Sequence, residues 1–230
     1  MRTISTLRSF IRTVLSIIRK DLVAEFRSHE LIGSMLVFSL LVILIFNFTI
    51  ELEPSLRLVI TPGVLWVTFL FAGTLALNRS ITSEKERGCF DGLLLAPVDR
   101  SAVFLGKMIG ILLSMLVVEL IILPVYSLLY NINLLRTGLL LIIFLGSLGY
   151  ATVGTLLSNM AVQTRLRDML LPILLFPVIL PLLLASVRAS GEILQGVELS
   201  GISTWLNLLV VYDIIFLAIS IMVFDYLVED

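Results

Sequence analysis

The sequence predicts an all-α membrane protein with six transmembrane helices, an N-terminal amphipathic helix at the membrane interface and a short cytoplasmic helix between the second and third spans. Of its 230 residues 59% are hydrophobic and only 14% are charged, and the mean hydropathy is +1.11. Soluble domains carry about 25% charged residues, so this composition indicates a protein whose main solvent is lipid. No regular alternation of apolar and polar residues suggests a membrane barrel.

Six segments are long and apolar enough to cross the hydrocarbon layer as helices, which takes about 20 residues. We expect the spans at about 31–50, 59–78, 104–130, 137–158, 169–188 and 204–225. They make one membrane domain, residues 31–230, which follows an interface helix at residues 1–30. The net charge of −1 argues against a broadly basic protein that binds nucleic acid.

The Lys and Arg residues predict which ends of the spans are cytoplasmic, because positively charged connections stay on that side. Six lie in the N-terminal segment, five in the second connection and the adjoining helix start, and two in the fourth connection. The opposite side holds only Arg57, Arg136 and Arg188. We therefore expect both termini and segment 83–97 to be cytoplasmic.

Residues 1–30 mix charged and apolar side chains throughout, unlike the short basic start and apolar centre of a signal peptide. Arg8, Arg12 and Arg19 follow one stripe of the predicted helix beside an apolar face, which suits the inner membrane interface. Asp21 and Glu25 project into the apolar arc and indicate either a frayed helix end or contact with a basic surface on a cytoplasmic partner. The apolar face repeats at steps of three and four, at Ile4, Leu7, Ile11, Val14, Ile18 and Leu22.

Segment 83–97, SEKERGCFDGLLLAP, places charges of both signs between two apolar spans. Ser83 and Glu86 form a capping box, which predicts a helix that starts at residue 84 and ends at Pro97, and Asp99 is placed to cap the third span. A solvated helix resting on the bilayer is one interpretation. The acidic residues favour the other, docking in a groove on another protein, because attachment to lipid alone favours Lys and Arg.

The run EKERGCFDGLLLAPVDRSAVFLGK resembles the cytoplasmic loop of the heme exporter protein B family (CcmB), the permeases of cytochrome c maturation. Three further places match in order: TPGVLWV at the second span, LGY at 148–150 in the fourth and PVILPLL at 177–183 in the fifth. Each motif is weak alone, but together they extend the resemblance over roughly residues 20–188.

The resemblance implies an ABC-2-like permease in a bacterial or archaeal cytoplasmic membrane, with a coupling helix near 83–97 that docks on a separate ABC ATPase subunit. Further implied partners are a heme-handling membrane protein and an outer-face heme chaperone, besides membrane lipids. Their joint task is to load or release heme that is then attached to cytochromes c. The residues assigned to the ATPase contact are Glu84, Lys85, Glu86, Arg87, Gly88, Phe90, Asp91, Gly92, Leu93, Leu94, Leu95 and Pro97.

The chain is not expected to be an enzyme, because it has no G-x-x-x-x-G-K-[ST] motif and ATP hydrolysis must come from a partner. His29 and Cys89 are its only His and Cys, so no metal site is expected. Both are predicted to be cytoplasmic, and we expect heme to be handled by the complex and not ligated by this subunit. Trp66 and Trp205 are interpreted as interface anchors.

Glu119 and Asp213 lie deep in the third and sixth spans, where an ionisable side chain is costly and is a candidate for transport or gating. A protonated or hydrogen-bonded structural role is the alternative. Pro172, Pro177 and Pro181 should bend the fifth span, in a gate or in a static helix. Close helix packing is expected at the small residues of the fourth span, Gly146, Ser147, Gly149, Ala151 and Gly154.

Two other functions fit the same sequence. A generic ABC-2 type exporter of a lipid, glycan or drug would form its own pathway as a homodimer. A membrane assembly scaffold would transport nothing, and changes in segment 83–97 would leave ATP-dependent function intact.

Overall fold

The computed structural model describes residues 2–49, 54–86, 99–161 and 167–227, and nearly all of these are helical. All helices except the first contain a stretch long and apolar enough to cross a membrane. The predicted all-α membrane fold with six spans is therefore confirmed. The helices are α1 (Arg2–Ser28), α2 (Glu30–Thr49), α3 (Pro54–Glu86), α5 (Arg100–Tyr130), α6 (Thr137–Ala161), α7 (Arg167–Leu194) and α8 (Ser203–Leu227).

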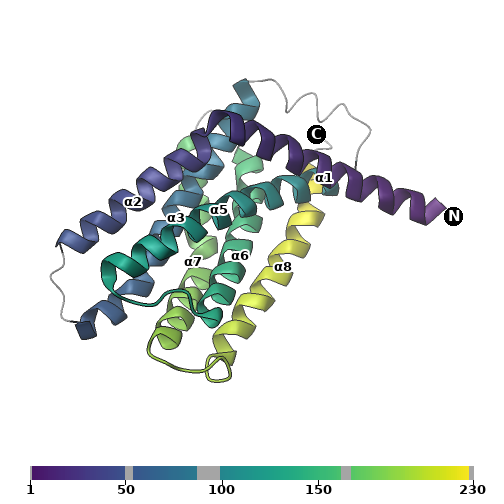
Figure 1. The fold of residues 1–230 in the computed structure, drawn as a ribbon. Helices are drawn as coiled ribbons and strands as arrows, with labels where there is room; N and C mark the ends of the chain where they lie inside the picture. The colour runs from purple at the N-terminus through teal and green to yellow at the C-terminus, as the bar shows by residue number, and fades with distance from the viewer. Residues whose placement is uncertain (1, 50–53, 87–98, 162–166, 228–230) are drawn as a thin grey trace.

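The six spans run alternately up and down side by side, and α1 lies across one end of the bundle and projects beyond it (Figure 1). Helix α6 is at the centre, since it contacts α3, α5, α7 and α8 and its span is the most buried of the six. The spans of α2 and α8 are the least buried. The core therefore lies around α6, and α2 and α8 form outer walls.

The helix ends around segment 83–97 differ in part from the prediction. Asp99 caps α5, because its side chain accepts from the Ser101 N–H at 3.0 Å, as expected. A helix start at residue 84 is wrong, because α3 continues without a break through Ser83 to Glu86. The charged residues 84–86 are good helix formers, and no Gly or Pro lies between Gly73 and Gly88, so nothing in that stretch of the sequence stops α3 earlier.

The small residues of α6 allow its neighbours to approach closely, which confirms their predicted packing role. A Cβ atom on Gly146 would lie 2.1 Å from the indole of Trp66, and one on Gly154 would lie 2.5 Å from Leu77, both on α3. A Cβ on Gly149 would lie 2.8 Å from Leu182 of α7. We call Gly146, Ser147, Gly149, Ala151 and Gly154 the α6 seam.

Trp66 is not an interface anchor, so that interpretation is wrong. Its side chain is only 4% exposed, and its indole N–H donates to the Ser190 hydroxyl of α7 at 2.9 Å. The indole fills the space that Gly146 leaves open on α6. A buried tryptophan with a hydrogen-bond partner is a packing residue, and at mid-span that partner must come from another helix.

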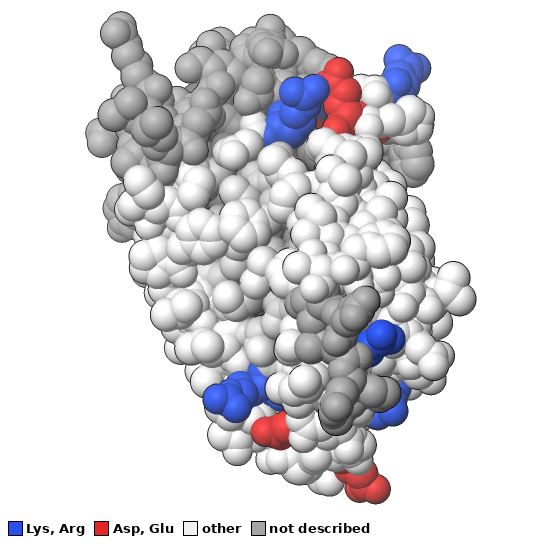
Figure 2. Space-filling model, turned by 90° about the vertical axis from the view of Figure 1, so that its left-hand side faces the viewer, with Lys and Arg blue, Asp and Glu red and all other residues white. Residues whose placement is uncertain are grey.

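Charged side chains gather at the two ends of the bundle, with a broad uncharged band between them on the face shown in Figure 2. At the end away from α1, Arg136 donates to the Ile193 carbonyl at 2.7 Å, and Trp205 donates to Glu192 at 3.0 Å. Arg136 thus places a positive charge at the C-terminus of α7, where the helix dipole favours it.

Candidate functional site

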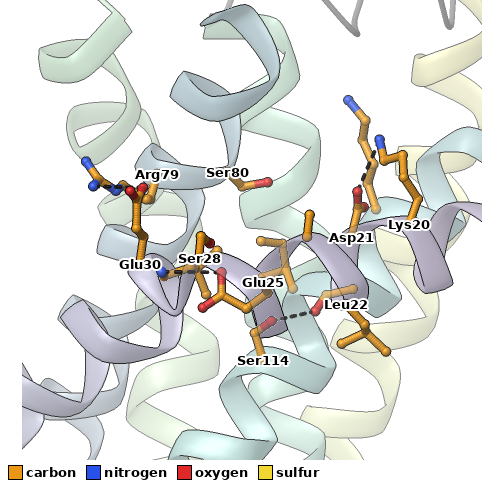
Figure 3. A pocket seen from close by; sticks show the side chains of 14 residues that line it. Lys20, Asp21, Leu22, Glu25, Ser28, Glu30, Arg79, Ser80 and Ser114 are labelled. Atoms are coloured by element: carbon orange, nitrogen blue, oxygen red, sulfur yellow. Dashed lines mark hydrogen bonds and ion pairs between the residues drawn. The ribbon is translucent and has the colours of Figure 1, made fainter. Parts of the chain in front are cut away.

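A cavity of about 200 Å³ lies between α1 and the adjoining ends of α2, α3 and α5 (Figure 3). It combines charges of both signs with small and apolar side chains from four helices. We call it the α1 cleft. Its lining residues are Lys20, Asp21, Leu22, Ala24, Glu25, Ser28, Glu30, Leu31, Arg79, Ser80, Lys107, Gly110, Ile111 and Ser114.

Helix α1 forms one wall of the cleft because it packs along the start of α5. Ile17 is buried, and a Cβ on Gly106 of α5 would lie 2.9 Å from its side chain. One turn further along α1, Asp21 faces Gly110, the next small residue of α5. Ile11 and Leu15, by contrast, are 50% and 59% exposed, so α1 keeps an apolar arc beside its arginines. The side chains of Ile4 and Leu7 lie outside the described part of the molecule.

Glu25 joins α1 to α2, so the interpretation of this acid as part of a frayed helix end is wrong. Its carboxylate accepts from the backbone N–H groups of Leu31 and Ile32, at 3.3 and 2.8 Å. These are among the first N–H groups of α2, which have no carbonyl partner within that helix. His29 occupies the left-handed region with φ 52° and makes the sharp turn that brings Glu25 back to α2. Glu25 is therefore a helix cap.

Asp21 is not at a frayed end either, because α1 remains helical through Ser28. Its carboxylate pairs with Lys20 at 3.1 Å, and across the cleft Glu30 of α2 pairs with Arg79 of α3 at 3.0 Å (Figure 3). Lys107 of α5 also lines the cleft and is only 8% exposed. The cleft thus brings together three cations and three carboxylates from four helices.

The predicted coupling segment adjoins the cleft through α3. Glu84, Lys85 and Glu86 form the last residues of that helix. The other predicted contact residues, from Arg87 to Pro97, lie outside the described residues, and so does Cys89. The structure therefore describes the two helix ends that flank this segment, the end of α3 and the capped start of α5.

Glu119 lies in the interior, as its position in the sequence predicts. It is 3% exposed, and one carboxylate oxygen accepts from the Ser147 hydroxyl of the α6 seam at 2.5 Å. Its other oxygen has no hydrogen-bond partner within the described chain. The structural alternative, a carboxyl group hydrogen-bonded inside the bundle, therefore holds for one of the two carboxylate oxygens.

Asp213 approaches the α6 seam from the other side. It is 6% exposed on α8, and a Cβ on Gly149 would lie 2.4 Å from one of its carboxylate oxygens. Neither oxygen has a hydrogen-bond partner among the described residues. Ser147 and Gly149 stand two residues apart, so α6 places the two acids on different sides of itself. Among the described residues, Glu119 and Asp213 therefore do not form a single site.

The predicted gate prolines lie along the outer side of a helix that is not interrupted. Helix α7 continues through all three prolines from Arg167 to Leu194. Pro177 and Pro181 are exposed and Pro172 is half-buried, whereas Leu175, Ile179 and Leu182 face the core. No described group of three or more His, Cys, Asp or Glu residues could hold a metal ion.

Sequence reasoning missed the α1 cleft because its residues come from four helices. One signal was available, since Asp21 and Glu25 break the apolar arc of α1 and both face this junction. The pairing of Glu30 with Arg79 had no such signal, because 49 residues separate the two side chains.

Six apolar spans around a small-residue centre define this chain as a multi-span α-helical membrane protein. A family model described as CcmB protein matches residues 12–228. The chain therefore belongs to the CcmB family. This agrees with the resemblance found in the sequence motifs.

Similar proteins in several bacteria carry the name heme exporter protein B. The Pseudomonas aeruginosa protein is 26% identical over 182 residues, which cover 79% of this chain and 82% of that relative. The Escherichia coli K12 protein is 36% identical over 94 residues, which cover 41% and 43% of the two chains. The Bradyrhizobium diazoefficiens protein is 26% identical over 184 residues.

Proposed function

We propose that this protein is the permease subunit of an ABC-type heme exporter in cytochrome c maturation. The observation that carries the proposal is the CcmB family match over residues 12–228, together with relatives named heme exporter protein B that align over most of the chain. The six-span fold supports it, because an exporter subunit must cross the membrane. The chain would form the pathway across the membrane or the helices that move during transport, and a separate subunit would hydrolyse ATP.

The end of the bundle that carries α1 would face the cytoplasm. The N-terminal segment, the second connection and the fourth connection hold 13 of the 16 Lys and Arg residues, and the three others belong to the opposite side. This excess follows the positive-inside rule. Both termini would then lie in the cytoplasm, on the side where ATP and an ATPase subunit are found.

Segment 84–97, which comprises the last three residues of α3 and the connection that follows, would be the contact with the ATPase subunit. It connects the end of α3 to the capped start of α5, and these two helices contact each other and α6. Displacement of the segment would therefore move two core helices at once. Glu30 and Arg79 link α3 to α2, and α1 packs on α5, so the whole cytoplasmic end would respond.

The subunit itself would not ligate heme, which a partner would hold. His29 is exposed at the turn between α1 and α2, between Ser28 and Glu30, which both line the cleft. A heme transferred to an outer-face chaperone needs its iron ligand on the other side of the membrane. The proposed role is transmission of work from the ATPase to a heme-handling membrane protein.

Deletion of the gene in its host, followed by heme staining for covalently bound cytochromes c, tests this function. Loss of c-type cytochromes with b-type cytochromes retained, and rescue by a plasmid copy, is the expected result. Normal c-type cytochromes in a host with no second copy would contradict it and favour the generic exporter.

A second experiment separates coupling from scaffolding. Leu93→Asp with Leu94→Asp, or Glu86→Lys with Arg87→Glu, should abolish cytochrome c production while the protein stays in the membrane with its partners. The matched control is Glu198→Lys, a charge reversal in the exposed connection before α8. Unchanged cytochrome yield in both double variants would refute the coupling role of the segment.

A further inference from the structure

The α1 cleft lies where a membrane headgroup would lie. Helix α1 crosses the end of the bundle, with exposed Ile11 and Leu15 beside exposed Arg12 and Arg19, as in helices that rest in the interface plane. Asp21 and Glu25 face inward from the same helix and line the cleft. The cleft therefore opens at the depth of phospholipid headgroups.

The charges of the cleft suit a ligand that carries both signs. Lys20, Arg79 and Lys107 supply cations from α1, α3 and α5, and Asp21 and Glu30 supply carboxylates from α1 and α2. These charges already have partners, since Lys20 pairs with Asp21, Arg79 pairs with Glu30, and Glu25 accepts from the first amides of α2. A bound anion alone would compete with the carboxylates for the cations, whereas a phosphate that carries its own ammonium group can replace both members of an ion pair.

The size of the cleft and the surface beside it also fit a lipid. A cavity of about 200 Å³ is smaller than the roughly 300–1,000 Å³ of drug-sized pockets and suits a small polar group whose remainder stays outside. From Glu30 one face of α2 leads away from the cleft, because residues at steps of three and four share a helix face. That face is apolar and 53–79% exposed, at Val37, Leu41, Ile45 and Phe48.

We propose that the α1 cleft binds the headgroup of a zwitterionic phospholipid of the phosphoethanolamine type, with its acyl chains along the exposed face of α2. Lys107 and Lys20 bind the phosphate, and Asp21 accepts from the ammonium group. The bound lipid would hold α1 against α2 and α5 at the membrane surface. This inference is independent of the transported species, because cytochrome c yield does not measure lipid binding.

Native mass spectrometry of the full chain in detergent tests the proposal. The chain is titrated with dioleoyl phosphatidylethanolamine, with dioleoyl phosphatidylglycerol and with soluble phosphorylethanolamine. We expect the ethanolamine lipid to bind at least about fivefold more tightly than the glycerol lipid, since the latter lacks the ammonium group. Soluble phosphorylethanolamine should bind more weakly than the lipid, because it lacks the chains that contact α2.

Three variants locate the site. Lys107→Gln and Asp21→Asn should each weaken binding of the ethanolamine lipid about tenfold, as loss of a charge-assisted hydrogen bond predicts. Lys20→Gln is included because Lys20 is exposed on α1, so this variant should fold even if the other two do not. The control is Arg188→Gln, which removes an exposed cation on α7 near the opposite end and should leave binding unchanged.

Three results would overturn the proposal. Equal affinity for the two lipids would refute recognition of a zwitterion. Unchanged binding in Lys20→Gln and in every folded variant of Lys107 and Asp21 would place the lipid elsewhere. Soluble phosphorylethanolamine that binds as tightly as the lipid would assign the cleft to a free phosphate ester.

Discussion

The α6 seam and the α1 cleft hold helices together by different physical means. In the seam, contact depends on missing side-chain volume, since Trp66, Leu182 and Leu77 occupy space that Gly146, Gly149 and Gly154 leave open. In the cleft, contact depends on charge, through the pair of Arg79 with Glu30 and the cap that Glu25 forms on α2.

This difference follows from the solvent at each depth. Inside the bilayer the hydrophobic effect does not draw apolar helices together, so close packing and internal hydrogen bonds must do so. At the interface water competes for every charge, so ion pairs are weak and can be exchanged. We therefore expect the seam to be rigid and the cleft to be the part that changes with ligands and conditions.

The largest effect is expected from adding volume to the seam. Gly146→Ala places a methyl group against the buried Trp66 and should destabilise the folded protein by about 1–3 kcal/mol, and Gly146→Leu should prevent folding. Equilibrium unfolding in mixed micelles measures the change. Gly63→Ala is the control, because a Cβ there meets nothing within 4 Å, and alanine should stabilise α3 by about 0.5–1 kcal/mol. Equal destabilisation by both would refute the packing role.

Removal of the polar contact inside the seam should be next in size. Ser147→Ala leaves both oxygens of Glu119 without a partner among the described residues, which should cost about 1–3 kcal/mol. In a Glu119→Leu background the same change should cost much less, because no buried carboxyl group is then left unsatisfied. A double-mutant cycle of unfolding free energies measures the coupling. Additive effects would show that the hydrogen bond contributes nothing.

Loss of the cap between α1 and α2 should have a smaller and local effect. Glu25→Ala removes the acceptor for the Leu31 and Ile32 N–H groups and should cost about 1 kcal/mol. Hydrogen exchange followed by mass spectrometry should show faster exchange in the first turn of α2. The first turn of α5, which Asp99 caps, is the internal control. Unchanged exchange at α2 would contradict the capping role.

The smallest effect is expected at the exposed ion pair of the cleft. Side chains of Arg79 and Glu30 are 51% and 58% exposed, so a double-mutant cycle of Arg79→Gln and Glu30→Gln should give a coupling energy below about 1 kcal/mol. Salt at 1 M should remove most of it, because screening is then nearly complete. A coupling energy that exceeds that of Glu119 with Ser147 would reverse the comparison between seam and cleft.

The sequence by itself determined the features that depend on neighbouring residues. Apolar length fixed the six spans, the step of three and four fixed the helical nature of α1, and Asp99 was identified as a cap from its place before α5. The small residues of α6 were also assigned to packing, because only small side chains let helices approach closely in lipid.

Tertiary structure alone decided which side chains meet across helices. Trp66 became a packing residue because α6 and α7 place Gly146 and Ser190 beside it, and Glu25 became a cap because the turn at His29 folds α2 back. Periodicity is a local property and can be read along the chain. The rotation and register of each helix against the next result from all the packing contacts together, so the partners of Trp66, Glu119 and Arg79 could not be deduced from the sequence.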